Sequence, residues 1–173
     1  MKLNWFNRAI NGYQRVEFSV ESKQYNQLDR LRHAVNYYRE REDNGEDTYV
    51  STDIPSISRV FIITGIEHAM LQGFLPFAKA FFHHLQKHMQ QLSPYAQSFK
   101  KTYAYLHVSE QKAIYDLYAM TQEYVEDEHL KHMQQNYVFS EAELIRFFIM
   151  YGSNELNNKA VKEASRLLSV HSI

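Results

Sequence analysis

Residues 15–20 alternate strictly between polar and apolar side chains, in a chain whose other patterns are helical. Successive side chains of a strand point to opposite faces, so this alternation predicts a strand with one apolar and one polar face. The apolar face holds Val16, Phe18 and Val20, and the polar face holds Arg15, Glu17 and Ser19. A single short strand is not stable alone, and no neighbouring strand is evident in the sequence. We therefore expect it to pair with the same strand of a second copy, in a homodimer or a higher oligomer.

The rest of the chain is predicted to be helical. Ser22 can cap a helix that runs to about Tyr38, and an acidic loop follows it. Pro55 then opens a second helix, which Gly73 can close. Periodic apolar residues predict further helices over residues 76–92, 95–106, 110–135, 142–151 and from about 154 to the end. The complete capping box of Ser140 and Glu143 opens the helix at 142, and Gly152 is expected to end it.

The composition is that of an ordinary globular protein. The 173 residues are 45% hydrophobic and 23% charged. The chain has no cysteine, which excludes disulfides, thiolate zinc sites and cysteine nucleophiles. No stretch has the apolar run of a secretory signal or of a membrane span. These features favour a cytoplasmic protein without a membrane partner.

The formal net charge of −1 hides a segregation along the chain. Residues 1–39 hold seven Lys or Arg and three Asp or Glu, whereas residues 40–72 hold two basic and seven acidic residues. The predicted strand and its following helix therefore form the one basic region. Contacts from Lys and Arg to phosphates supply most of the affinity of nucleic-acid binding, so this region is the candidate for such a role.

The order of strand, helix, acidic loop and helix over residues 13–72 resembles the ribbon-helix-helix family of DNA-binding proteins. The matching segments are 15–20, 22–38 and 54–61, and the pattern is most similar to plasmid relaxosome accessory proteins and repressors. The resemblance implies a mainly α protein with a dimerisation and DNA-binding module at 1–72. A helical region at 73–173 would serve oligomerisation or the binding of another protein. It also implies sequence-specific binding of double-stranded DNA, in transcription regulation or conjugation, without catalysis or a cofactor.

Within this family a ribbon of two strands enters the major groove of DNA. The resemblance assigns base contacts to Arg15, Glu17 and Ser19, since these side chains can pair with guanine, with the cytosine amine and with either kind of base edge. It assigns phosphate contacts to the N-terminus of the second helix, at Ser56, Ser58 and Arg59. The dimer core would consist of Val16, Phe18 and Val20. Glu17 and the long acidic loop depart from the pattern of the family.

Two other functions stay open from the residues themselves. The acidic loop and the near-neutral charge favour a helical interaction or inhibitor protein without DNA. A metalloenzyme would use His and carboxylate ligands at helical spacing, and the candidate ligands are His84, His88, Glu126 and His129. The second Glu-x-x-His motif that a di-metal site needs is missing. The sequence also has no Gly-rich phosphate loop and no Gly-x-Ser-x-Gly.

Overall fold

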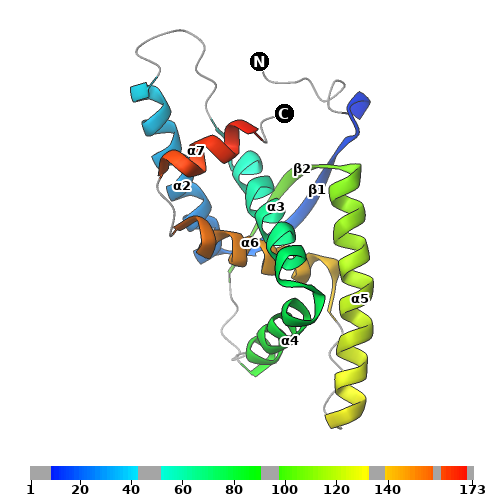
Figure 1. The fold of residues 1–173 in the computed structure, drawn as a ribbon. Helices are drawn as coiled ribbons and strands as arrows, with labels where there is room; N and C mark the ends of the chain where they lie inside the picture. The colour runs from blue at the N-terminus through cyan, green and yellow to red at the C-terminus, as the bar shows by residue number, and fades with distance from the viewer. Residues whose placement is uncertain (1–8, 43–51, 91–97, 133–138, 158–160, 171–173) are drawn as a thin grey trace.

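The computed structural model describes residues 9–42, 52–90, 98–132, 139–157 and 161–170. Helices dominate this part of the chain, which confirms the mainly α prediction (Figure 1). In chain order, the elements are β1 (Tyr13–Glu21), α2 (Ser22–Glu42), α3 (Ile54–Gln72), α4 (Phe74–Gln90), β2 (Phe99–His107), α5 (Val108–His132), α6 (Glu141–Asn157) and α7 (Val161–Val170). Helix α3 runs through the middle of the molecule, and α6 crosses it (Figure 1).

The strand β1 finds its partner inside its own chain, not in a second copy as predicted. It pairs antiparallel with β2, in a register that runs from Tyr13 opposite His107 to Glu21 opposite Phe99. Residues 95–106 are predicted to be helical, but the structure has a strand over most of this segment. The reason is a second alternation of side chains, in an aromatic-rich segment that favours a strand. Ala104 and Leu106 are buried, and the residue between them lies on the opposite face.

The apolar face of β1 covers the core of the same chain. Phe18 and Val20 are buried, and Val16 is half-buried against the same core. The predicted dimer core of these three residues is therefore an internal one. Because Phe18 and Val20 pack beneath their own helices, these two are not available to a second copy. The polar face of the strand is left outside.

Helix α3 and helix α6 approach each other through a glycine on each. A Cβ atom added to Gly65 of α3 would lie 2.8 Å from the Cα of Phe148. A Cβ atom added to Gly152 of α6 would lie 2.9 Å from the Cα of Phe61, and closer still to its carbonyl oxygen. Gly152 is predicted to end its helix, but α6 continues through it to Asn157. Its role is therefore to admit the backbone of α3, not to terminate α6.

The two segments that the sequence divides at residues 72 and 73 share one core. Buried side chains from both segments join a single hydrophobic cluster, with members from Phe18 to Leu168. Gly73 follows α3 with a φ of 86°, as predicted. The last helix, predicted from about residue 154, begins at Val161. The backbone N–H of Ser140 donates to Glu143 Oε2 over 2.7 Å at the start of α6. None of the described helices is long and apolar enough to span a membrane.

Replacement of Gly152 by Ala tests the crossing. In an ordinary helix interior this change stabilises a protein by about 0.5–1 kcal/mol. Here the added methyl group meets backbone atoms of α3, so we expect a loss of about 1–3 kcal/mol from overpacking. Urea denaturation followed by circular dichroism measures the difference. A stabilised Gly152→Ala protein would show that the helices do not meet at this residue.

Candidate nucleic-acid interface

The two strands present one continuous polar and aromatic surface, which we call the outer face. It consists of Arg15, Glu17 and Ser19 on β1 and Lys101, Tyr103 and Tyr105 on β2. These residues alternate with the buried ones, and the register sets Arg15 opposite Tyr105, Glu17 opposite Tyr103 and Ser19 opposite Lys101. The side chains of Arg15 and Glu17 are 53% and 69% exposed. All three residues predicted to contact bases therefore lie together on an accessible strand.

Contacts on the outer face hold the Arg15 side chain in place. Its Nη2 lies 2.8 Å from Oε1 of Glu17, and its guanidinium lies 4.1 Å from the centre of the Tyr103 ring. The Tyr103 ring in turn meets the Tyr105 ring edge to face, with 5.6 Å between the ring centres. A cation over an aromatic face is attracted by the ring, which restrains the arginine without removing it from solvent. The arginine is thus ordered and still accessible.

The outer edge of β1 carries unpaired backbone groups. The ladder with β2 is bracketed by two hydrogen bonds, from the N–H of Ser22 to the carbonyl of Ser98 and from the N–H of Val108 to the carbonyl of Gly12. These bonds show that the backbone groups of residues 12 and 22 point toward β2. Because backbone groups alternate in direction along a strand, those of Arg15 and Glu17 point away from β2. Among the described residues they have no hydrogen-bond partner. This half of the edge is free.

The other half of the edge is partly covered by α6. Arg146 Nη1 donates to the carbonyl oxygen of Ser19 over 3.4 Å. The same arginine lies over the ring of Phe99, with 5.5 Å from Cζ to the ring centre. The free part of the edge therefore ends near Ser19 and is centred on Val16.

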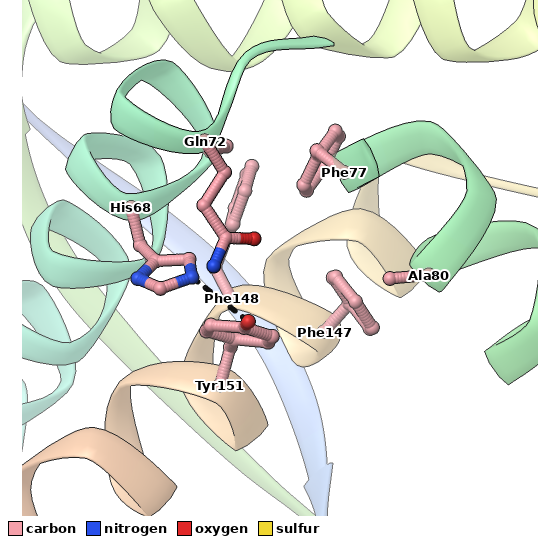
Figure 2. Close-up of a pocket in the computed structure, with 9 residues that line it drawn as sticks. His68, Gln72, Phe77, Ala80, Phe147, Phe148 and Tyr151 are labelled. Atoms are coloured by element: carbon pink, nitrogen blue, oxygen red, sulfur yellow. Dashed lines mark hydrogen bonds between the residues drawn. The ribbon is translucent and has the colours of Figure 1, made fainter. Parts of the chain in front are cut away.

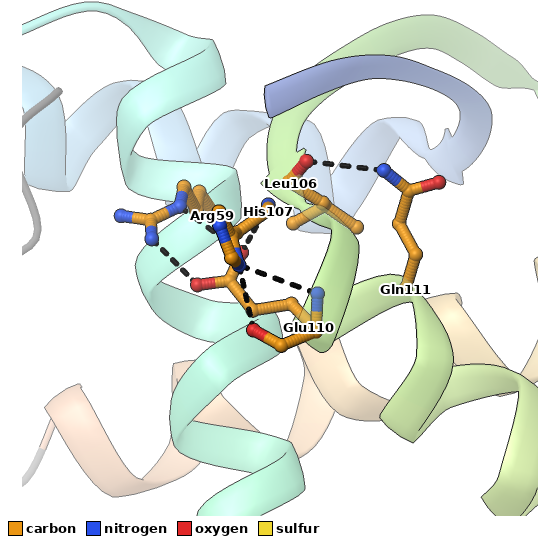
Figure 3. A network of polar contacts seen from close by, with 6 residues as sticks. Arg59, Leu106, His107, Glu110 and Gln111 are labelled. Atoms are coloured by element: carbon orange, nitrogen blue, oxygen red, sulfur yellow. Dashed lines mark hydrogen bonds and ion pairs between the residues drawn. The ribbon is translucent and has the colours of Figure 1, made fainter. Parts of the chain in front are cut away.

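Arg59, predicted to contact phosphate, lies in the interior. It is 5% exposed, and its Nη2 lies 2.5 Å from Oε1 of Glu110 (Figure 3). The Oε2 atom of Glu110 accepts a hydrogen bond of 2.8 Å from the backbone N–H of His107. The guanidinium also lies 5.3 Å from the centre of the Tyr13 ring. Arg59 thus ties α3 to the junction of β2 and α5 and is not part of the candidate surface.

The two serines predicted to bind phosphate are also engaged elsewhere. Ser58 is fully buried, so its hydroxyl cannot reach a nucleic acid. The backbone N–H and the hydroxyl of Ser56 both donate to Oδ1 of Asp53, over 2.9 and 2.6 Å. Asp53 caps α3 and places a carboxylate where a phosphate was expected. The phosphate site predicted at the start of this helix is therefore already filled by the chain itself.

Part of the basic region also serves the fold. Arg39 of α2 donates to the side chains of Thr52, Ser165 and Ser169 and to the backbone carbonyl of Ser165. It thereby links α2 to α7 and to the segment that leads into α3. Arg32 forms an ion pair of 2.8 Å with Asp29 on its own helix. The charge count of residues 1–39 therefore overstates the number of basic side chains that are available to a ligand.

All three outer-face residues of β2, including Tyr105, are missing from the predicted site. Lys101 and Tyr103 enter the surface because β2 pairs with β1, whereas a helix is predicted there. The alternation of polar and apolar residues over 101–106 was the available signal. The candidate surface is thus carried by two strands of one chain.

The structure describes the side chains of two of the four alternative metal ligands, His84 and Glu126. The ring of His84 contacts the ring of Phe147, with 5.1 Å between centres. Glu126 accepts a hydrogen bond of 3.3 Å from Gln122. The side chains of His88 and His129 lie outside the described residues. Within the described part of the chain, no three His, Asp or Glu side chains are grouped closely enough to hold a metal ion.

The pair of Arg59 and Glu110 yields a prediction about stability. Arg59→Leu leaves the carboxylate of Glu110 largely buried without its partner, so we expect a loss of about 3–5 kcal/mol. The double variant Arg59→Leu with Glu110→Leu removes both charges and should recover most of that loss. Urea denaturation of the four proteins completes the double-mutant cycle. Simple additivity of the two losses would contradict a coupled pair.

Comparisons with family models, with curated proteins and with solved structures give no match for this chain. The resemblance to ribbon-helix-helix proteins therefore rests on the sequence pattern alone. A fold hosts many functions, so the function has to be argued from the chemistry of the outer face and of the free edge.

Proposed function

We propose that the protein binds double-stranded DNA as a homodimer, through the outer face of its β1–β2 ribbon. The supporting observation is this face itself, which sets two exposed basic side chains, Arg15 and Lys101, among hydrogen-bonding and aromatic groups. A ribbon of two strands is narrow enough to enter the major groove, and in the dimer the β1 strands of the two copies supply it. The resemblance stated above extends the proposal to a plasmid-borne repressor or relaxosome accessory factor in the cytoplasm. No catalytic step is part of it.

The free edge of β1 supports the dimer. If two copies pair antiparallel about Val16, Arg15 faces the partner's Glu17 and Glu17 faces the partner's Arg15. Such a contact is self-complementary, as a two-fold axis requires. Each such pair also exchanges the backbone hydrogen bonds that Arg15 and Glu17 lack in one chain. The ion pair that each chain makes internally is replaced by one across the strands, where opposite charges are favourable.

In this dimer, the two central strands are narrow enough to enter a DNA groove. Pairing through β1 gives a sheet of four strands in which the two β1 strands are central. At about 4.8 Å between neighbours, the two outer β2 strands lie about 14 Å apart. The major groove is about 12 Å wide, so the central strands would face base edges while Lys101 of each copy would reach the phosphates beside the groove.

Base contacts would come from the central strands. Arg15 can donate two hydrogen bonds to guanine, Glu17 can accept from the cytosine amine, and Ser19 can do either. Glu17 repels phosphate and therefore lowers affinity for unrelated sequences. A DNA-binding surface that combines an arginine with a carboxylate discriminates better between DNA sequences and binds DNA in general more weakly.

A protein-binding function is the second candidate, and one observation favours it. At the corner between α3 and α4, Met70, Leu71 and Leu75 are 61%, 86% and 51% exposed. Large apolar side chains grouped on a surface are typical of protein contacts. A partner protein would thus dock at this corner, away from the ribbon.

Salt dependence tests the DNA proposal. Binding to a random 25-base-pair duplex, measured by fluorescence anisotropy, is expected to weaken steeply as salt rises. Lys101→Ala removes one phosphate contact per chain, so the slope of log affinity against log salt should fall by about 2 for the dimer. Lys79→Ala, which removes an exposed lysine of α4, is the matched control and should leave the slope unchanged. Absence of binding at low salt would refute the proposal.

Arg15 provides the test of sequence reading. After selection of a preferred site from a random duplex pool, Arg15→Ala should cost about 1–3 kcal/mol on that site. It should cost much less on random DNA, since phosphate contacts from Lys101 remain. Equal losses on both duplexes would mean that Arg15 contacts only the backbone of DNA.

Charge reversal tests the dimer separately from DNA. Glu17→Arg sets two arginines opposite each other at each end of the proposed contact, so the dimer should dissociate in analytical ultracentrifugation. The double variant Arg15→Glu with Glu17→Arg restores opposite charges and should restore the dimer. A parent protein that is monomeric at high concentration, or a double variant that stays dissociated, would contradict pairing through β1.

A further inference from the structure

Helix α4 is attached to the rest of the molecule by one of its faces. The centre of the Phe77 ring lies 5.8 Å from that of Phe147 and 5.6 Å from that of Phe148 (Figure 2). The small hollow beside these rings has room for about one water molecule, so α4 is closely packed on this side. The opposite side of α4 faces solvent.

The exposed side of α4 is basic. The helix contains no Asp or Glu. Lys79, His83 and Lys87 follow one another at a spacing of four residues, so they share one face, and all three are exposed. Leu75, which is 51% exposed, lies four residues before Lys79 and connects this face to the apolar corner between α3 and α4. Neither lysine forms an ion pair with the described residues. We call Leu75, Lys79, His83 and Lys87 the basic face.

The exposed side of α5 is acidic. Residues 113–128 hold five Asp or Glu and no Lys or Arg. Glu123, Glu126 and Asp127 are exposed, and none of them forms an ion pair with the described residues. Tyr115 and Met120 of the same helix are 64% and 46% exposed. These five residues make up the acidic face, in which apolar side chains lie among carboxylates.

The two faces belong to neighbouring helices at one end of the molecule. The rings of Phe82 on α4 and Tyr124 on α5 meet edge to face, with 6.4 Å between their centres. Figure 1 shows α4 and the second half of α5 at the end that lies away from α2 and α7. Rotation of a second copy by 180° about an axis between α4 and α5 would set each basic face on the acidic face of the other copy. Such a contact is self-complementary, as a two-fold axis requires.

We propose that α4 and the second half of α5 bind a second copy of this chain, with the basic face of each copy on the acidic face of the other. Opposite charges meet in this contact, and the apolar side chains that both faces expose are covered. The proposal names the occupant of the corner between α3 and α4, so it rests on the protein-binding function above and does not depend on DNA binding. Together with pairing through β1, it joins two dimers into a tetramer.

Analytical ultracentrifugation tests this contact in the Glu17→Arg protein, in which pairing through β1 is already broken. We expect this protein to form dimers at low salt and to become monomeric at about 1 M salt, where charges are screened within about 3 Å. Reversal of the basic face by Lys79→Glu with Lys87→Glu should weaken the association at least ten-fold. Reversal of the acidic face by Glu123→Lys with Asp127→Lys should weaken it by a similar factor.

A mixture of the two reversed proteins separates a specific contact from damage to either helix. Each reversed protein repels its own kind, but the two carry opposite charges wherever they face each other, so an equimolar mixture should form dimers again. Lys23→Glu with Arg30→Glu is the matched control. It makes the same change of net charge as reversal of the basic face, at two exposed cations of α2, and should leave the association unchanged.

All the substituted residues are exposed, so the variants are expected to fold, and circular dichroism checks this. If Glu17→Arg fails to fold, the same reversals are measured in the parent protein, whose mass should fall by half. Three results would overturn the proposal: a Glu17→Arg protein that stays monomeric at low salt, an association that reversal of either face leaves unchanged, or an equimolar mixture that does not associate. DNA binding is measured separately by anisotropy, so the failure of one proposal is distinguishable from the failure of the other.

Discussion

The crossing of α3 and α6 is the contact on which the other packing depends. The two helix backbones meet closely because Gly65 and Gly152 each leave room for the opposite helix. With α3 fixed in this way, its buried face covers β2 and its charged residue Arg59 reaches the start of α5. Most of α3 is buried, as expected for a helix surrounded by others. Any side chain at either glycine would push α3 away from several neighbours at once.

The position of α3 explains why the strands have one free face. Helices pack against the apolar side of the ribbon, and the chain folds its own second strand beside β1. The polar side and half of one edge are then left to solvent. In an isolated chain, Glu17 neutralises Arg15, and in the proposed dimer the same two residues select the partner. The acidic residue that departs from the ribbon-helix-helix pattern thereby acquires a role.

Local signals in the sequence predict most of the helices but fail over residues 95–106, which form a strand. Contacts between distant segments leave no local signal in the sequence. The cap at Ser140 and the stop at Gly73 depend on neighbouring residues, so they could be predicted. In the sequence, Gly152 is typical of a residue that ends a helix. Only its contact with the backbone of Phe61 shows that it makes room for α3. Arg59 looks like a surface cation for the same reason, since its partner Glu110 is 51 residues away.

The candidate site likewise contains residues that local signals predict and residues that depend on contacts between distant segments. The shared face of Arg15, Glu17 and Ser19 follows from the period of a strand, and the structure keeps these residues together. Lys101 and Tyr103 could not be added before the pairing of β2 was known, because a short alternating run is ambiguous beside many helices. The register between strands is set by the whole core, not by either strand alone.

Mapping the DNA contact on the protein tests the central claim most directly. A random duplex is titrated into the ¹⁵N-labelled protein at low salt, and the amide signals are followed by NMR. Shifts are predicted at Arg15, Glu17, Lys101 and Tyr103, with the amides in the second half of α5 unchanged. Shifts confined to the helices, or no shifts at all, would contradict the ribbon as the DNA-binding surface.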